Sequence, residues 1–580
     1  MMFLRSLCFL NLFNLVAVHA SFTPPILEWG TTSPEPTLNI HSMPIVGGGM
    51  PIGNGKVLGY VFAVDPVDGP TTISPSFILP TGVSFMVDMP EAMASDASLF
   101  SLGMVSLDTV PSMFANEDWR LNFHQYLNAS EGSVTVSTAR ASIKVWVEAT
   151  TNMIAASITS AEPVELLVQI QSLRPMDKRF LYAGEDLSKL RINASFPTSN
   201  PDHFLIDEMK TTLTVSHRNV PADQPAYFND TLQQQGLSHL IEMLSSSDHW
   251  SNRQFGMAIS GNNLMVNKTK KIFTKNGTAA KYFLQSNQMS TEFTLVVSTH
   301  ANQTKSNKEF QQQLAAVHHN HTALSEPSAE HVKEWSEFWS RSHVVVSQQS
   351  SNNSNSSNNS NSSNNSNSSN SSNNSNSSNS SNNGFTQSDS DSDNLDTLSL
   401  KYALTRYLQT IQVKGGVGGW IPIKFNGLGF TTQLPPTNTS SGPTFKAWGP
   451  NSWWRNTRLP YGNMLTSGDY QDYTNILEFI LQMIPFAQQR TMTYFNHTGI
   501  FFTEVKTLFG SYRPVDYGDY FNDRVLNVSV PYQYELNSYL RYDFGGDGGT
   551  TEAAFMVLDY YDSTNDLDAL ERYAPIILGT

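Results

Sequence analysis

The sequence predicts a multidomain β + α protein, with an amino-terminal antiparallel β-sandwich followed by a helical linker and an α-helical domain. Short runs rich in Val, Ile and Thr, several of them alternating, recur within residues 21–305. Apolar residues recur at helical spacing in residues 306–345 and again in residues 395–580. A chain of 580 residues is also too long for one ordinary core, so we expect at least two domains.

Residues 1–20 have the features of a secretory signal peptide. Arg5 supplies a positive charge, an apolar run extends from Leu7 to Val18, and small residues around Ala20 suit cleavage. The only cysteine, Cys8, lies in this segment, so the mature chain would lack disulfides and zinc–thiolate sites. No other apolar run approaches the roughly 18 residues that a membrane span needs. We expect a secreted, extracellular protein, or one of the endolysosomal lumen, with no membrane span.

Charge and glycosylation motifs restrict the expected partners. The formal net charge is −15 and no basic stripe is present, which argues against nucleic acid as a partner. Asn-X-Ser/Thr motifs outside the low-complexity tract predict N-glycans on surface loops. These motifs begin at Asn128, Asn193, Asn229, Asn267, Asn276, Asn302, Asn320, Asn438, Asn496 and Asn527.

The predicted β-sandwich occupies residues 21–305. Its clearest strand patterns cover residues 133–147, 153–158, 164–170, 211–215 and 293–297. Near its start, Gly53-Asn54-Gly55 allows positive φ angles and predicts a tight hairpin turn. A dinucleotide-binding loop is not expected there, because no helical pattern follows.

The linker, residues 306–345, is predicted to be helical and to pack between the two domains. Its apolar residues at helical spacing are Phe310, Leu314, Val317, Val332, Trp335, Phe338 and Trp339. His318, His319 and His321 are either a metal cluster or a solvated helix end. The helix end is favoured, because Asn320 begins a glycosylation motif and no H-E-x-x-H spacing occurs. We therefore expect no metal.

Residues 346–394 contain a tract of almost only Ser and Asn, which cannot bury apolar area and is predicted to be a disordered insertion. From residue 395 the pattern is helical again. The helices expected there include one around residues 395–411 and others at 471–495, 550–561 and 566–577. Long aromatic loops separate them, and such loops on a helical scaffold often carry sites.

Residues 449–465 concentrate tryptophan, arginine and asparagine in a short stretch. Trp453 and Trp454 are adjacent and must point in different directions on a regular backbone. Pro460 excludes a helix interior, so the stretch is expected to be a loop or a helix start. Two interpretations remain open at this point. The side chains form a sugar-binding wall, or the tryptophans fill a core and the arginines cap helix ends.

Several motifs together resemble the six-hairpin glycosidases. In chain order they are PIGNGKVLG at 51–59, WSEFWSRS at 335–342, IPIKFNG at 421–427, WWRNTRLPY at 453–461, YLRYDFGG at 539–546 and MVLDYYDSTND at 556–566. The resemblance covers most of the mature chain outside the Ser/Asn tract. It is strongest to an uncharacterised secreted branch related to the α-L-fucosidases of glycoside hydrolase family 95.

The resemblance implies an (α/α)6 barrel after the sandwich, with an active site on the barrel axis. It also implies inverting hydrolysis without metal or cofactor. Asn456 matches one asparagine of the set that activates water in the related fucosidases. Trp454 and Pro460 stand where other asparagines of that set would be, so the set is altered here. Residues 395–580 supply too few helices for a full barrel, and the family's general acid normally follows them. An incomplete barrel would expose a large apolar face.

The sequence and the resemblance together give a set of candidate site residues. Asn456 is the candidate catalytic residue, because it would orient the attacking water. The candidate substrate-binding residues are Lys424, Asn426, Trp453, Trp454, Arg455, Arg458, Tyr461 and Glu504. Lys424 and Asn426 have a hydrogen-bonded turn as their alternative, and Glu552 is expected to place its charge in the first turn of a helix.

The leading functional hypothesis is a secreted glycoside hydrolase-like protein that acts on extracellular oligosaccharides. Its partner would be carbohydrate, and its own surface would carry N-glycans. Two alternatives stay open: a non-catalytic carbohydrate-binding protein and a structural secreted glycoprotein.

Overall fold

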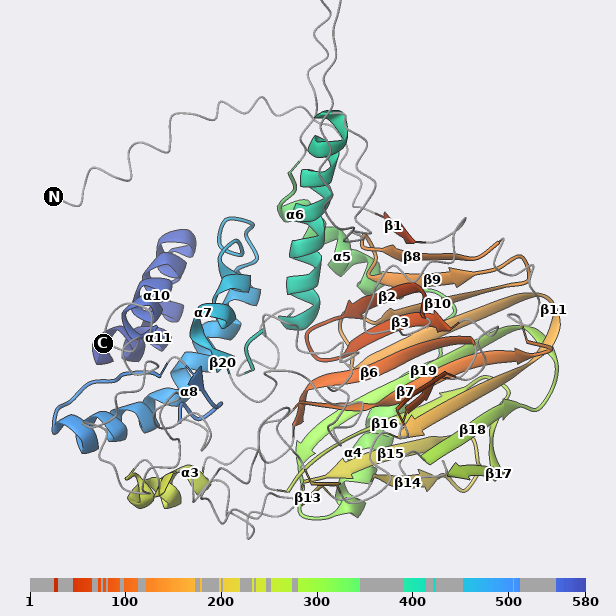
Figure 1. Ribbon diagram of the computed structural model, residues 1–580, viewed down its shortest axis with the longest axis horizontal. Helices are drawn as coiled ribbons and strands as arrows, with labels where there is room; N and C mark the ends of the chain where they lie inside the picture. Colours follow the sequence, from red (N-terminus) through yellow and green to blue (C-terminus); the bar gives the residue numbers. More distant parts are fainter. Residues whose placement is uncertain are drawn as a thin grey trace, which may run out of the picture. The chain divides into compact units, whose positions relative to one another are not determined.

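A computed structural model gives the fold (Figure 1). It describes residues 26–29, 45–64, 71–74, 77–79, 82–93, 99–112, 122–172, 178–179, 198–199, 202–219, 232–233, 236–246, 252–273, 280–344, 391–413, 421–423, 452–503, 505–511 and 549–580. The predicted signal peptide and nearly all of the predicted insertion lie outside these residues.

The chain forms two compact units. The larger unit contains Thr23–Ser342 and Leu404–Thr580, and the smaller one contains Met1–Phe22 and His343–Ala403. Of the smaller unit, the structure describes residues 343–344 and the first part of helix α6 (Asp391–Val413). The predicted domain boundaries at residues 305, 345 and 394 stay predictions.

The larger unit contains two antiparallel sheets, which confirms the large antiparallel β structure predicted from the sequence. Sheet A has the order β1 (Ile26–Trp29), β8 (His124–Asn128), β9 (Ser133–Ser137), β10 (Ala141–Val147), β11 (Met153–Ser172), β19 (Ser290–Gln303), β16 (Arg253–Gly261), β15 (Leu213–Arg218) and β14 (His203–Ile206). Sheet B has the order β2 (Ile45–Gly53), β3 (Leu58–Val64), β6 (Gly82–Met93), β7 (Leu99–Val110), β11, β18 (Ala280–Ser286) and β17 (Leu264–Phe273). Two further pairs of strands are β4 (Thr71–Ser74) with β5 (Phe77–Leu79) and β12 (Lys178–Arg179) with β13 (Thr198–Ser199).

Strand β11 belongs to both sheets. Its first part pairs with β10 and β19 in sheet A, and its second part pairs with β7 and β18 in sheet B. The register shifts between Thr159 and Val164, a stretch that contains Pro163. Proline cannot donate to a ladder and is placed at irregular points of strands. Two separate strands were therefore predicted where the chain has one long, irregular strand.

The two sheets pack face to face. Strand β10 contacts β2 and β3, and strands β16 and β19 contact β6. Phe85 and Val105 of sheet B, and Ile154 and Val297 of sheet A, are fully buried. The interface is thus a continuous apolar layer, as expected for a sandwich.

The helices predicted in the linker are α4 (Asn307–His319) and α5 (Ala329–Arg341). The predicted stripe of α5 is buried at Trp335, Phe338 and Trp339, whereas Val332 is exposed. The Trp339 indole donates to the carbonyl of Ala129 at 2.8 Å. Helix α5 is thereby fixed to the end of strand β8.

Of the three histidines at the end of α4, His319 is exposed as predicted, whereas His318 and His321 are partly buried. His318 lies with its Nε2 2.8 Å from Ser260 Oγ and its Nδ1 2.8 Å from Ser298 Oγ. His321 Nδ1 lies 2.7 Å from the same Ser298 Oγ. Burial, and then the charge of His321, lowers the pKa of His318 to about 4. The predicted solvation is wrong for these two residues, because strands β16 and β19 cover them.

The Gly53-Asn54-Gly55 hairpin turn is confirmed between β2 and β3. Asn54 is buried, and its Oδ1 accepts the backbone N–H of Val57 at 2.9 Å. Its Nδ2 donates to two carbonyls of the β10–β11 turn, each at 2.7 Å. The Gly55 N–H donates to the Ile411 carbonyl of helix α6 at 2.8 Å. This turn therefore joins both sheets to the last turn of α6.

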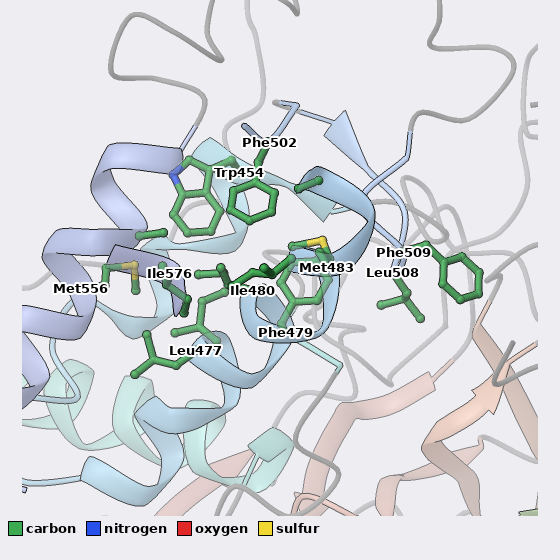
Figure 2. Close-up of a cluster of buried hydrophobic side chains, with 14 of the residues drawn as sticks. Trp454, Leu477, Phe479, Ile480, Met483, Phe502, Leu508, Phe509, Met556 and Ile576 are labelled. Atoms are coloured by element: carbon green, nitrogen blue, oxygen red, sulfur yellow. The ribbon is translucent and has the colours of Figure 1, made fainter. Parts of the chain in front are cut away.

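The carboxyl-terminal helices also match the sequence expectations. They are α6, α8 (Tyr470–Phe495), α10 (Thr550–Thr564) and α11 (Leu567–Gly579). The apolar stripe predicted for α8 is buried at Tyr473, Ile476, Leu477, Ile480, Met483 and Ile484. Helices α10 and α11 pack on α8 and on each other, and their inner residues share one core cluster with it (Figure 2). A short helical pair, α3 (Ile241–Ser246) with a preceding 3-10 turn, η2 (Ser238–Leu240), supplies further leucines to that cluster.

Asp469 precedes α8, but its side chain does not cap the helix. Its side chain makes no cap hydrogen bond. Instead its carboxylate accepts Arg406 Nε at 2.7 Å and Nη2 at 2.7 Å, and Arg341 Nη2 at 3.0 Å. Arg406 also donates to the Phe338 carbonyl at 2.9 Å. The Asp469 carboxylate thus pairs with a buried arginine of α6 instead of accepting the backbone N–H groups at the start of α8.

The outer surfaces of α10 and α11 expose large apolar residues. Phe555 is 56% exposed, Leu567 65% and Leu578 84%. The described helices do not show the ring of an (α/α)6 barrel. No helix among the described residues is both long and apolar enough to cross a membrane.

Candidate functional site

The tryptophan-rich stretch contains a short segment of secondary structure, here named the α7 segment (residues 452–461). It contains strand β20 (Ser452–Trp453), helix α7 (Trp454–Thr457) and the 3-10 turn η4 (Leu459–Tyr461). Strand β20 pairs with β21 (Val505–Lys506). Pro460 lies in the first positions of η4, where its missing N–H costs no helical hydrogen bond.

The two tryptophans point in different directions, as their adjacency predicts. Trp453 is partly exposed, whereas Trp454 is only 1% exposed and joins the core cluster (Figure 2). Lys506 Nζ lies 4.6 Å from the centroid of the Trp454 ring. Gly549, at φ +85°, packs so closely on the indole that a Cβ there would overlap it. Trp454 is therefore a support for the segment rather than an exposed ring.

Glu552 connects helix α10 to the α7 segment. Its Oε2 accepts the Trp454 Nε1–H at 2.7 Å, and its Oε1 lies 3.2 Å from Arg458 Nη1. It also stands in the first turn of α10, as the sequence predicts. Glu552 and Arg458 are each 33% exposed in their side chains, so the ion pair lies at the surface. One carboxylate thus holds a buried indole and orients a half-exposed guanidinium.

Tyr461 supports the other end of the segment. It is fully buried, and its hydroxyl donates to Asn475 Oδ1 and accepts the Ile423 N–H at 2.8 Å. Asn475 Nδ2 in turn donates to the Ile421 carbonyl at 2.9 Å. Burial raises the pKa of Tyr461, so the phenol stays neutral. This network fixes residues 421–423 beside the α7 segment.

The exposed side of the segment carries three polar or aromatic groups. Arg455 is exposed, and Trp453 and Asn456 are partly exposed. The Asn456 carboxamide makes no hydrogen bond with any residue that the structure describes. Arg458 Nε is buried and has no hydrogen-bond partner among the residues that the structure describes. The Asn456 carboxamide therefore offers a donor and an acceptor to a ligand on a rigid base.

The predicted site residues thus divide into three groups. Trp453, Arg455, Asn456 and Arg458 lie together with at least part of their surface exposed. Trp454 and Tyr461 belong to the core, so neither has a ring face free for the sugar contact predicted for it. Lys424, Asn426 and Glu504 lie outside the described residues.

Glu552 was missed as a partner of this site. It lies 98 residues from Trp454 in the chain, and a glutamate in the first turn of a helix already has a local role. The glycine-rich run before it (residues 545–549, GGDGG) was the available signal of a close contact, because glycine allows another group to approach the backbone closely. Among the described residues, no group of three or more His, Cys, Asp or Glu is placed to hold a metal ion.

Sequence comparison finds similarity to a family of undefined role. A family model described as a domain of unknown function (DUF5703), in its amino-terminal part, matches residues 81–344. This range runs from strand β6 through α5 and so includes the linker helices with the strands. No curated protein sequence matches the chain.

Similar solved structures include a protein described as a kojibiose phosphorylase, from the human microbiome. It has a TM-score of 0.44 and 12% identity over 91% of this chain and 56% of that chain. A bacterial glucoamylase complexed with acarbose has a TM-score of 0.30 and 8% identity over 96% of this chain and 69% of that chain. A family GH92 α-mannosidase from Bacteroides thetaiotaomicron has a TM-score of 0.21 and 8% identity over 52% of this chain and 36% of that chain.

The chain thus spans little more than half the length of the kojibiose phosphorylase that it resembles. At these TM-scores and identities, the likeness assigns no activity to this chain. The structural neighbours are carbohydrate-active enzymes.

Proposed function

We propose that this chain is a glycoside hydrolase-like protein that binds extracellular oligosaccharides at the α7 segment. One observation carries the proposal. The α7 segment holds Arg455, Asn456 and Arg458 with at least part of their surface exposed, next to the partly exposed Trp453, while Trp454 and Tyr461 anchor it in the core.

The side-chain chemistry of this surface suits a sugar. The Asn456 amide can both donate to and accept from a hydroxyl, and the Arg458 guanidinium offers donors in a fixed plane. The partly exposed Trp453 ring offers an apolar face for the C–H side of a pyranose. Because the segment is held at both ends, binding would immobilise few side chains.

Described residues beside the α7 segment are neighbours in sequence of the other candidate residues. Ile423, whose N–H donates to Tyr461, immediately precedes Lys424. Val505, which pairs with Trp453, immediately follows Glu504. These backbone connections support the proposal that Lys424, Asn426 and Glu504 belong to the same binding wall.

Hydrolysis is the further part of the proposal. Within an (α/α)6 barrel, Asn456 would orient a water molecule for metal-free attack with inversion at the anomeric carbon. An inverting reaction also needs a base and an acid on opposite sides of the sugar. Glu552 already accepts from Trp454 and pairs with Arg458, so the acid would have to come from residues outside the described part of the chain.

Ligand-observed NMR with a panel of malto-, manno-, xylo- and fuco-oligosaccharides tests the binding. We expect at least one sugar to bind, and Asn456→Ala to weaken its binding about fivefold, since a hydrogen bond contributes about 1 kcal/mol. Asn287→Ala is the matched control, because Asn287 is an exposed turn residue of the sandwich. Binding that is equally strong in the Asn456 variant would contradict the proposed site.

A non-catalytic carbohydrate-binding protein is the second candidate. The observation that favours it is the engagement of both Glu552 oxygens, which leaves the described part of the site without an unengaged carboxylate. Aryl glycosides separate the two candidates. Turnover that Asn456→Ala abolishes supports the hydrolase, and sugar binding without turnover of any glycoside supports the second candidate.

A further inference from the structure

The asparagines of the glycosylation motifs differ in the exposure and the hydrogen bonds of their side chains. Five of these motifs lie at described positions, at Asn128, Asn267, Asn302, Asn320 and Asn496. The atom that a glycan would occupy is the side-chain Nδ2. A motif is therefore compatible with a glycan when its Nδ2 is exposed and has no role in the fold.

Asn320 and Asn496 meet this condition. Each is exposed and is the C-cap residue directly after a helix, α4 and α8 respectively. Neither side chain makes a hydrogen bond with any residue that the structure describes. Asn496 has a left-handed backbone, with φ 50° and ψ 41°, and its N–H donates to the Met492 carbonyl at 2.9 Å. The backbone ends the helix, so the side chain stays available.

The hydroxyl residues of these two motifs are equally accessible. Thr322 completes the motif of Asn320, and Thr498 completes the motif of Asn496. Both threonines are exposed. A glycan at either position would extend from a helix end without displacing a described side chain.

Asn128 has the opposite environment. It lies in strand β8, which pairs on one side with β1 and on the other with β9. Its side chain is partly buried, and its Oδ1 accepts both the N–H and the hydroxyl of Ser130, the residue that completes its motif. A bulky group at this strand position would compete with the sheet.

Asn267 and Asn302 are intermediate, because their Nδ2 atoms already act as donors. Asn267 donates to Gln285 Oε1 at 3.3 Å, and Asn302 donates to Gln313 Oε1 at 3.0 Å. A glycan would take one of the two hydrogens of each amide.

We propose that Asn320 and Asn496 carry N-linked glycans and that Asn128 stays unmodified. The donor is a lipid-linked oligosaccharide pyrophosphate of the secretory pathway. The asparagine Nδ2 forms a bond to the anomeric carbon and loses one proton. The bond from that carbon to the pyrophosphate oxygen breaks, and the lipid pyrophosphate leaves with the electron pair.

The test is glycopeptide mass spectrometry on the full chain produced, with its own amino terminus, in a secretory eukaryotic cell. We expect the highest occupancy at Asn320 and Asn496, lower occupancy at Asn267 and Asn302, and none at Asn128. Thr322→Ala and Thr498→Ala should each remove one glycan while keeping the asparagine. Ser130→Ala should leave the glycan mass unchanged.

Equal or higher occupancy at Asn128, or no glycan at both Asn320 and Asn496, would overturn the proposal. The outcome does not depend on sugar binding at the α7 segment, because these helix ends contribute no residue to that segment. Failure of one proposal can therefore be told apart from failure of the other.

Discussion

Replacing Gly549 by alanine tests whether close packing of α10 on Trp454 holds the α7 segment in place. Gly549 has φ +85°, and a Cβ there would clash with three atoms of the Trp454 indole. The left-handed backbone costs an alanine about 1–2 kcal/mol. Overpacking against a rigid ring adds about 1–3 kcal/mol. The free energy of unfolding should therefore fall by about 2–5 kcal/mol in total.

Gly468→Ala provides the matched control. Gly468 has φ +73° and lies two residues before α8, and no atom beyond its chain neighbours lies within 4 Å of the position of its Cβ. This variant should lose only the backbone part, about 1–2 kcal/mol. The comparison therefore isolates the contact with Trp454 from the strain of the backbone.

Urea denaturation, followed by circular dichroism, measures both variants. In addition, Gly549→Ala should weaken binding of any oligosaccharide that the wild type binds, because a displaced Trp454 would move helix α7. Equal losses of stability in the two variants would refute the argument. Undiminished sugar binding in Gly549→Ala would refute the claim that the contact between Gly549 and Trp454 positions the exposed residues of α7 for binding.

Three further changes have defined outcomes. Asp469→Asn leaves the buried Arg406 without its counter-charge and should cost about 3–5 kcal/mol in urea denaturation, and a loss below about 1 kcal/mol would contradict this. Asn54→Ala removes hydrogen bonds at both its Oδ1 and its Nδ2 and should cost about 2–3 kcal/mol, and an unchanged midpoint would count against the role of the turn. Burial acts to raise the pKa of Glu478, but hydrogen bonds from Arg572 and Tyr573 outweigh it and lower that pKa. The interactions of ionised Glu478 therefore stabilise the fold fully above the unfolded pKa of about 4.3. This stabilisation is lost as the pH falls through the lower pKa that Glu478 has in the folded protein. Glu478→Gln should reduce the melting temperature at neutral pH and match the wild type at strongly acidic pH, and a pH-independent difference would exclude this linkage.

Local patterns predicted the helices and most strands because they repeat over many residues. The stripe of α8 is one example, since each predicted apolar position from Tyr473 to Ile484 is buried. Patterns failed where tertiary contacts decide. Strand β11 continues across Pro163 because its two parts have different partner strands. His318 is covered by strands that are distant in the sequence, and no local signal shows this.

The candidate site was predictable in position but not in the direction of each side chain. The sequence places Trp453 and Trp454 on opposite sides of the backbone but does not say which side is the core. The structure places Trp454 inside, because Gly549 leaves room for its ring and Glu552 accepts its N–H. Both residues come from the distant start of α10. Only a three-dimensional arrangement could identify the buried tryptophan.

The geometry of Glu552 limits the chemistry that the described part of the site can perform. A general acid must release its proton to the leaving oxygen, and a general base must accept one from water. Each Glu552 oxygen already has a partner: Oε2 accepts from the Trp454 indole, and Oε1 pairs with Arg458. Glu552 is thus suited to positioning Arg458 for a ligand. If hydrolysis occurs at this surface, its acid and base must come from outside the described part of the chain.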